Sequence, residues 1–214
     1  MTVPFITSVY GEATAEYDVK KSRFIASLKE VHTETEAAAY VAKIRKQYWD
    51  ARHNCYAYQI GASGLMQKSS DDGEPSGTAG KPMLEVLKKQ GITNTVVVVT
   101  RYFGGIKLGA SGLIRAYGHA VVLGLEAASI ADYKSYDVLA VRMAYPFVSM
   151  MERLAPTYHI RIAQRDFADA VTFTLEIPQE STAKVTELLT NNTNGTAVYT
   201  AQGQKTIPII RSHT

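Results

Sequence analysis

The sequence is poor in cysteine and has no long apolar run. Cys55 is the one cysteine among 214 residues, which excludes an intrachain disulfide and a thiolate-rich zinc site and agrees with a reducing compartment. A membrane-spanning helix needs roughly 18 or more apolar residues, whereas the apolar stretch Thr95–Thr100 is short and bounded by polar residues. Residues 1–10 also lack the basic start and the apolar stretch of a signal peptide. We therefore expect a cytoplasmic protein with no membrane partner.

The net charge is also small. The total is +3, from 23 Lys and Arg against 20 Asp and Glu, which does not by itself indicate a nucleic-acid-binding protein. The distribution is uneven, because no acidic residue lies between Glu85 and Glu126. This stretch contains Lys88, Lys89, Arg101, Lys107 and Arg115, and it follows an acidic cluster of Asp71, Asp72 and Glu74. Such segregation is typical of a surface that contacts a partner, and solvated faces that arose by chance are the alternative.

The hydrophobic fraction of 46% and the charged fraction of 20% are those of a globular protein, and the length allows two domains. Hydrophobic periodicity predicts a first domain over residues 1–132 that contains both strands and helices. The predicted elements are a strand or hairpin over Tyr17–Leu28, a helix that begins at a Thr33/Glu36 capping box, a strand over Asn54–Ile60, a polar loop over Gly61–Lys81, a helix over Pro82–Gln90, a buried strand over Thr95–Thr100 and a long helix over Leu108–Ser129. In the long helix, Gly112, Gly118 and Gly124 indicate a close approach to a sheet or to a ligand.

A second domain is predicted over residues 137–207, after a linker at Ala131–Ser135. Its elements are the strand Val138–Tyr145, the helix Phe147–Ala155, the strands Ile160–Gln164 and Val171–Ile177, the helix Ser181–Thr190 and the strand Thr196–Lys205. This βαββαβ order is that of the ferredoxin-like fold, with both helices on one face of an antiparallel sheet. The predicted fold class is therefore α+β. Because the second domain has no cluster of catalytic residue types, we expect it to act as a binding or packing module.

Glycine-rich turns precede the two later helices of the first domain. The turn residues are Gly77, Gly80, Gly104, Gly105 and Gly109, and Lys81 follows the first pair. Free amides at a helix start favour anions, so each turn is a candidate phosphate site. The first turn is not a P-loop, because Pro75 and Pro82 stand where that motif needs glycine and a hydroxyl residue. Tight turns that need glycine for their backbone angles are the alternative.

The acidic cluster is a candidate cation site. Asp71, Asp72 and Glu74 offer the hard oxygen ligands that magnesium prefers, so magnesium is the candidate cofactor. A solvated acidic turn, or one that pairs with Arg101 and Lys107, is the alternative.

His53 and Cys55 lie two residues apart on a predicted strand, so their side chains share a face. A nucleophile with an adjacent base is one interpretation, and a buried structural cysteine is the other. The sequence does not establish any catalytic residue.

The remaining interpretation is an RNA-binding surface. Its candidate phosphate contacts are Arg52, His53, Lys81, Arg101, Lys107 and Arg115. The side chains available to stack on bases are Tyr102, Phe103 and Tyr117. This interpretation accounts for the acid-free stretch, while the alternative places Phe103 in the core.

Four segments of the first domain contain closely spaced charged and polar residues, namely Lys21–Phe24, Ala51–Cys55, Ser70–Pro82 and Arg101–Gly109, of which the last two also contain several glycines. Together they resemble the signature of the YigZ/IMPACT family. The resemblance covers the whole chain and depends above all on the Ser-Asp-Asp-Gly-Glu-Pro run that begins at Ser70. It implies a first domain with the fold of the second domain of the small-subunit ribosomal protein number five, which is also that of domain IV of elongation factor G. It implies a second domain similar to domain V of that factor.

The resemblance also implies a role in translation. Eukaryotic members regulate translation under amino-acid stress through an additional N-terminal partner-binding domain that we do not expect here, so that mechanism is not transferred. Our leading hypothesis is a non-enzymatic protein that binds RNA or the ribosome and regulates translation. There are two alternatives. One is a phosphate- or nucleotide-dependent enzyme, hydrolase or kinase-like, that uses the acidic glycine-rich loop. The other is a regulator that binds another protein.

Overall fold

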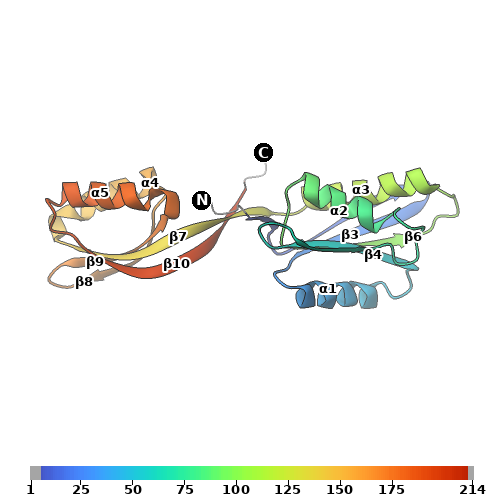
Figure 1. Ribbon diagram of the computed structural model, residues 1–214, viewed down its shortest axis with the longest axis horizontal. Coiled ribbons are helices and arrows are strands. Elements are labelled where there is room, and N and C mark those ends of the chain that lie inside the picture. Colours follow the sequence, from blue (N-terminus) through green and yellow to red (C-terminus); the bar gives the residue numbers. More distant parts are fainter. Residues whose placement is uncertain (1–5, 212–214) are drawn as a thin grey trace. The chain divides into compact units, whose positions relative to one another are not determined.

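The computed structural model describes residues 6–211 and confirms the predicted α+β class with two domains (Figure 1). Unit 1 comprises the chain up to Tyr133 together with the segment from Ile209, and unit 2 comprises Lys134–Pro208. Each unit has its own apolar core. Within the described residues, no helix is both long and apolar enough to cross a membrane.

Unit 1 is built on a five-stranded sheet in the order β2-β3-β6-β4-β5, in which every neighbouring pair is antiparallel. Its strands are β2 (Glu12–Val19), β3 (Ser22–Glu30), β4 (His53–Ile60), β5 (Met66–Ser70) and β6 (Thr95–Tyr102). The central strand β6 is buried on both faces, because alternate valines point to opposite sides of a sheet. Val97 and Val99 belong to one core and Val96 and Val98 to another.

Helices cover both faces of this sheet. Figure 1 shows α1 (Glu34–Gln47) on one face and α2 (Gly80–Lys89) and α3 (Ala110–Glu126) on the other. The capping box holds the start of α1, because the Glu36 amide donates to Thr33 Oγ1 (3.1 Å). The Glu36 carboxylate accepts from the His32 amide (2.8 Å), one residue before the N-cap. In α3, a Cβ at Gly124 would lie 2.3 Å from Leu28 Cδ1, so this glycine allows the helix to approach β3.

Three strands differ from the sequence predictions, namely β1 (Ile6–Val9), β5 and the first part of β7 (Ile130–Met143). The segment predicted as a linker lies inside β7, whose first residues pair with β1. Part of the predicted polar loop is β5, an edge strand of polar sequence that pairs with β4. These strands have too little apolar alternation to be recognised locally, and β1 is paired with residues far away in the chain.

Unit 2 has the βαββαβ order that the sequence predicts. Its elements after the start of β7 are α4 (Val148–Thr157), β8 (Arg161–Phe167), β9 (Val171–Pro178), α5 (Thr182–Asn192) and β10 (Val198–Ile210). The strand order β10-β7-β9-β8 is the ferredoxin-like order, and α4 and α5 lie on one face of the sheet (Figure 1). Phe173, Leu175 and Leu189 are fully buried in its core.

Candidate functional site at one end of the first sheet

The four signature segments meet at one end of the unit 1 sheet. The antiparallel register pairs Arg23 with Tyr102 and His53 with Arg101, so the starts of β3 and β4 lie beside the end of β6. The Gly104 amide donates to Ser22 Oγ (3.1 Å), and a Cβ at Gly104 would lie 1.9 Å from the Lys21 carbonyl group. Only glycine therefore fits where the segment after β6 passes the β2–β3 turn.

Asp71 closes the acidic loop onto the start of α2. Its carboxylate accepts from the amides of Gly77 (2.8 Å), Ala79 (3.0 Å) and Gly80 (2.8 Å). Burial raises the pKa of this carboxyl group, but the three amide donors together lower it more, so the pKa lies below its usual value. The free amides at the start of α2, which the sequence predicts as a candidate phosphate site, are thus already bound by a carboxylate of the protein.

Asp72 is also bound internally. One of its carboxylate oxygens accepts from the Asn54 amide (2.7 Å), and the other accepts from the guanidinium of Arg45 in α1. His53 Nδ1 donates to the Asp72 carbonyl oxygen (2.9 Å), which fixes the imidazole against the loop. Asp72 and His53 therefore tie the loop to the beginning of β4.

Glu74 turns into the core and forms a buried ion pair. Its Oε1 accepts from Arg101 Nη1 (2.6 Å) and from Tyr117 Oη (2.8 Å), and the Glu74 and Arg101 side chains are only 4% and 8% exposed. The guanidinium lies 5.5 Å from the ring centres of both Phe24 and Phe103. Burial raises the pKa of Tyr117, which keeps the phenol protonated so that it donates to Glu74.

Cys55 belongs to the same buried network. Its Sγ lies within hydrogen-bond distance of two acceptors, the Asp71 carbonyl oxygen (2.9 Å) and Tyr117 Oη (3.4 Å), which share the single thiol proton. Burial raises the pKa of Cys55 to about 12, so the thiolate needed for nucleophilic attack does not form near neutral pH. The geometry supports a structural cysteine and does not build a Cys/His nucleophile.

The three acidic side chains do not form a magnesium site. Asp71, Asp72 and Glu74 each point toward a different set of protein donors. Across residues 6–211, no group of three His, Cys, Asp or Glu side chains is arranged to hold a metal ion. The sequence offered pairing with Arg101 as the alternative to a metal site. Glu74 forms that ion pair, whereas Asp72 pairs with Arg45.

The predicted phosphate and base contacts divide into buried and exposed groups. Arg101 and Tyr117 face the interior, where both donate hydrogen bonds to Glu74, so they do not belong to a binding surface. The exposed cations are Arg52, Lys81, Lys107 and Arg115, and none of them forms an ion pair within the described part of the chain. Phe103 is 56% exposed, and Tyr102 Oη donates to Asp50 (2.8 Å). Gly105 and Gly109 have the positive φ of turn residues, as does Gly77.

Sequence reasoning missed the burial of Arg101 and an exposed tryptophan, Trp49. Arg101 shares a strand face with Val97 and Val99, so the alternation that buries those valines also indicates a buried arginine. Trp49 lies between α1 and β4 in a segment that also contains cations, which is a pattern visible in the sequence.

The fold and the site define a two-domain α+β protein whose four signature segments build one end of the first sheet. A family model described as the Impact N-terminal domain matches residues 20–125, and a domain of unknown function, DUF1949, matches residues 141–196. The chain belongs to the YigZ/IMPACT family, which confirms the predicted resemblance.

Several relatives span most of this chain. The IMPACT family member YvyE of Bacillus subtilis (strain 168) is 44% identical over 180 residues, which cover 84% of this chain and 83% of that protein. The IMPACT family member YigZ of Escherichia coli (strain K12) is 34% identical over 184 residues, covering 85% of this chain and 90% of that protein. A crystal structure described as that of a hypothetical protein is 31% identical, covers 93% of this chain and 98% of its own, and gives a TM-score of 0.59.

A eukaryotic relative matches a shorter part. Protein IMPACT of Rattus norvegicus is 36% identical over 95 residues, which cover 42% of this chain and 29% of that protein.

Proposed function

We propose that this protein binds RNA or a ribosomal particle through the signature end, the end of the unit 1 sheet where the four signature segments meet, and thereby takes part in the regulation of translation. The cations of this surface are Arg52, Lys81 and Lys107, which lie in the signature segments, and Arg115, which follows them in α3. One observation carries the proposal. The acidic loop gives its three carboxylates to internal partners, while Arg52, Lys81, Lys107 and Arg115 keep their charge at the surface without an ion-pair partner in residues 6–211. Four uncompensated cations on one unit suit a polyanion.

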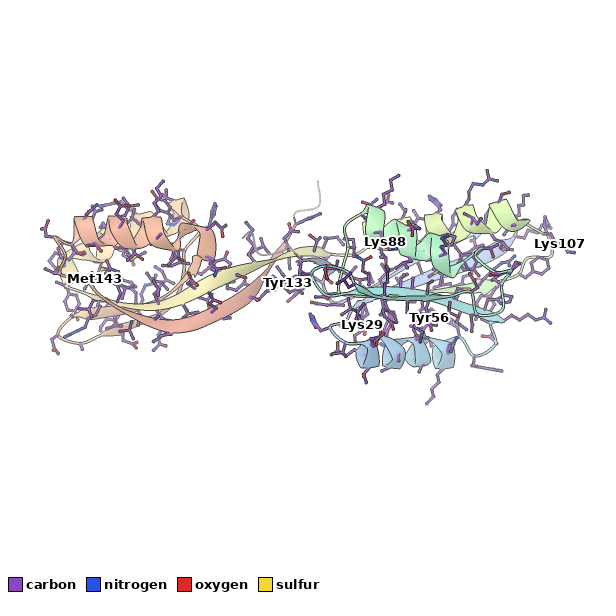
Figure 2. The ribbon with its side chains drawn as sticks, in the orientation of Figure 1. Lys29, Tyr56, Lys88, Lys107, Tyr133 and Met143 are labelled. Atoms are coloured by element: carbon purple, nitrogen blue, oxygen red, sulfur yellow. The ribbon has the colours of Figure 1, made fainter. Side chains whose placement is uncertain are left out.

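The cations come from separate segments, so the surface can follow a phosphate backbone. Arg52 precedes β4, Lys81 lies in the first turn of α2, Lys107 in the turn before α3 and Arg115 in α3. Figure 2 shows Lys107 projecting at one end of unit 1, whereas Lys88 lies toward the opposite end. Each phosphate contact releases counterions, so binding of this kind weakens as the salt concentration rises. Unit 2 has a complete core of its own, and its proposed part is to help docking.

Co-sedimentation with ribosomes and subunits across a salt series tests the proposal. We expect retention to fall with salt, and the double variant Lys107→Glu/Arg115→Glu to lose retention and to show a flatter salt dependence. The matched control is Lys68→Glu/Lys89→Glu, which makes the same change in net charge at exposed cations away from the signature end. Equal retention of both double variants, or no retention of the wild type at low salt, would contradict the proposal.

The alternatives have less support. A phosphate-dependent enzyme would use the acidic loop, whose carboxylates and helix start are already occupied by protein groups. A protein-binding regulator would be retained by its partner after nuclease treatment, which the same sedimentation experiment distinguishes.

The proposed location is the cytoplasm. The buried lone cysteine supports a reducing compartment.

A further inference from the structure

Trp49 is an exposed aromatic side chain on a well-fixed turn. It is the chain's one tryptophan, and it is 82% exposed. The backbone around it is held, because the Tyr48 amide donates to the Ile44 carbonyl oxygen (2.9 Å) and the Ala51 amide to that of Tyr48 (3.1 Å). The turn is also tied to the sheet, since Tyr102 Oη donates to Asp50. The fold thus fixes the backbone that carries the indole and buries little of its surface.

The charges around this turn favour an anion. Lys46 in the last turn of α1 and Arg52 just before β4 lie three residues on either side of Trp49. Both are exposed, and neither forms an ion pair within residues 6–211. The acidic residue of the turn, Asp50, accepts from Tyr102, and the neighbouring Arg45 is paired with Asp72. In the sequence, therefore, a flat exposed aromatic residue is flanked by two cations that form no ion pair within residues 6–211, against one carboxylate, Asp50, that is directed to a neutral phenol.

This combination suits one form of nucleic acid. Single-stranded chains are bound by stacking their bases on aromatic side chains while cations follow the phosphates, and every base has a face that can stack. In a duplex the base faces are already stacked on one another and are closed to an added indole. Arg52 belongs both to this turn and to the proposed RNA surface, so the two features are continuous along the chain.

We propose that Trp49 stacks on an unpaired base, and hence that the RNA bound at the signature end is single-stranded. This inference rests on the proposed RNA binding. The indole supplies a flat surface for the base, and Lys46 and Arg52 contact the adjacent phosphates. Base sequence has little influence, because stacking does not depend on hydrogen bonds to base edges.

Tryptophan fluorescence provides a direct test, because all of the tryptophan emission comes from Trp49. Oligouridylate and oligoadenylate are titrated into the protein at low salt, beside an RNA duplex of equal length. We expect saturable quenching by both single strands, which weakens with salt, and little quenching by the duplex. Quenching by the duplex equal to that by the single strands would overturn the inference.

Binding of fluorescently labelled RNA to variants provides the second measurement. We expect Trp49→Ala to bind the single strand about tenfold more weakly and the duplex unchanged, and Trp49→Phe to restore most of the affinity. The control is Leu65→Ala, which removes an apolar side chain of 83% exposure from the same unit and should bind as the wild type does. Because Trp49 is exposed, circular dichroism is expected to show that both alanine variants are folded.

The outcomes separate this inference from the proposed function. RNA binding that is lost in Lys107→Glu/Arg115→Glu but unchanged in Trp49→Ala, without quenching, would overturn stacking and leave the proposed function standing. Absence of binding to any RNA or ribosomal particle would overturn both. Quenching by a nuclease-treated particle, but not by free RNA, would assign the indole to a protein partner and overturn the inference.

Discussion

At the scale of the residue, Arg101 is a cation held in the interior by one carboxylate. Breaking a buried ion pair leaves an uncompensated charge, so we expect Glu74→Ala to lower the free energy of unfolding by roughly 3–5 kcal/mol. Urea denaturation followed by circular dichroism measures the change. Glu85→Ala is the control, because Glu85 pairs with Lys88 while its side chain is 58% exposed, and it should cost less than about 1 kcal/mol. Similar losses in the two variants would show that Arg101 does not depend on Glu74.

Asp71 links the shape of the loop to pH. Its pKa is lowered in the folded protein, so its ionised form stabilises the fold above the unfolded pKa of about 3.9, and this contribution is lost as the pH falls through the lower folded value. We expect Asp71→Asn to be less stable than the wild type at neutral pH by roughly 1–3 kcal/mol. The difference should shrink as the pH falls below about 4. Thermal unfolding across a pH series checks this, and a difference that stays constant would contradict it.

The candidate site was predictable in its location, but which of its charged side chains are buried was not. The signature segments contain the residues that build it, and three of the exposed cations, Lys81, Lys107 and Arg115, lie at or near the glycine-rich turns. Arg101 lies in the same acid-free stretch as Lys107, yet one is buried and the other exposed. To tell the buried cation from the exposed one, the strand face of Arg101 and the inward direction of Glu74 must be known. Both depend on tertiary packing rather than on the spacing of residues in the sequence.

At the scale of the element, local signals located the strongly patterned helices and strands. The capping box placed the start of α1, and the valine run placed β6, because burial on both faces requires an uninterrupted β-branched sequence. The strands β1 and β5 and the first part of β7 had no comparable signal. Their polar or mixed sequences adopt the extended form because a distant or edge partner supplies the hydrogen bonds.

Two glycines of α3 give opposite predictions for the same substitution. Gly118→Ala should raise the free energy of unfolding by about 1 kcal/mol, because its Cβ would meet Val86 at 3.7 Å and alanine favours the helix. Gly124→Ala should lower it by about 1–2 kcal/mol, because its Cβ would overlap buried Leu28. Paired urea denaturation curves measure both changes. Equal signs would contradict the assignment of Gly124 to the contact between α3 and β3.

At the scale of the whole molecule, the separate cores predict separate unfolding. Phe173 is fully buried in unit 2, so Phe173→Ala should cost roughly 3–5 kcal/mol and raise amide hydrogen exchange over residues 134–208. Exchange over residues 6–133 should not change. Met83→Ala, at a fully buried position in unit 1, should give the reverse pattern. A rise in exchange over both units in either variant would show that they unfold as one.

Unit 1 is completed by residues that come after unit 2 in the chain. The Arg211 amide donates to the Ile130 carbonyl oxygen (2.8 Å), and the Arg211 guanidinium binds Asp132 beside β1. A polypeptide is synthesised from its N-terminus, so the first unit gains these contacts only after every residue of the second has been made. During synthesis, therefore, the unit that starts first is finished last, and a chain truncated after Pro208 would contain all residues of unit 2 but only part of unit 1.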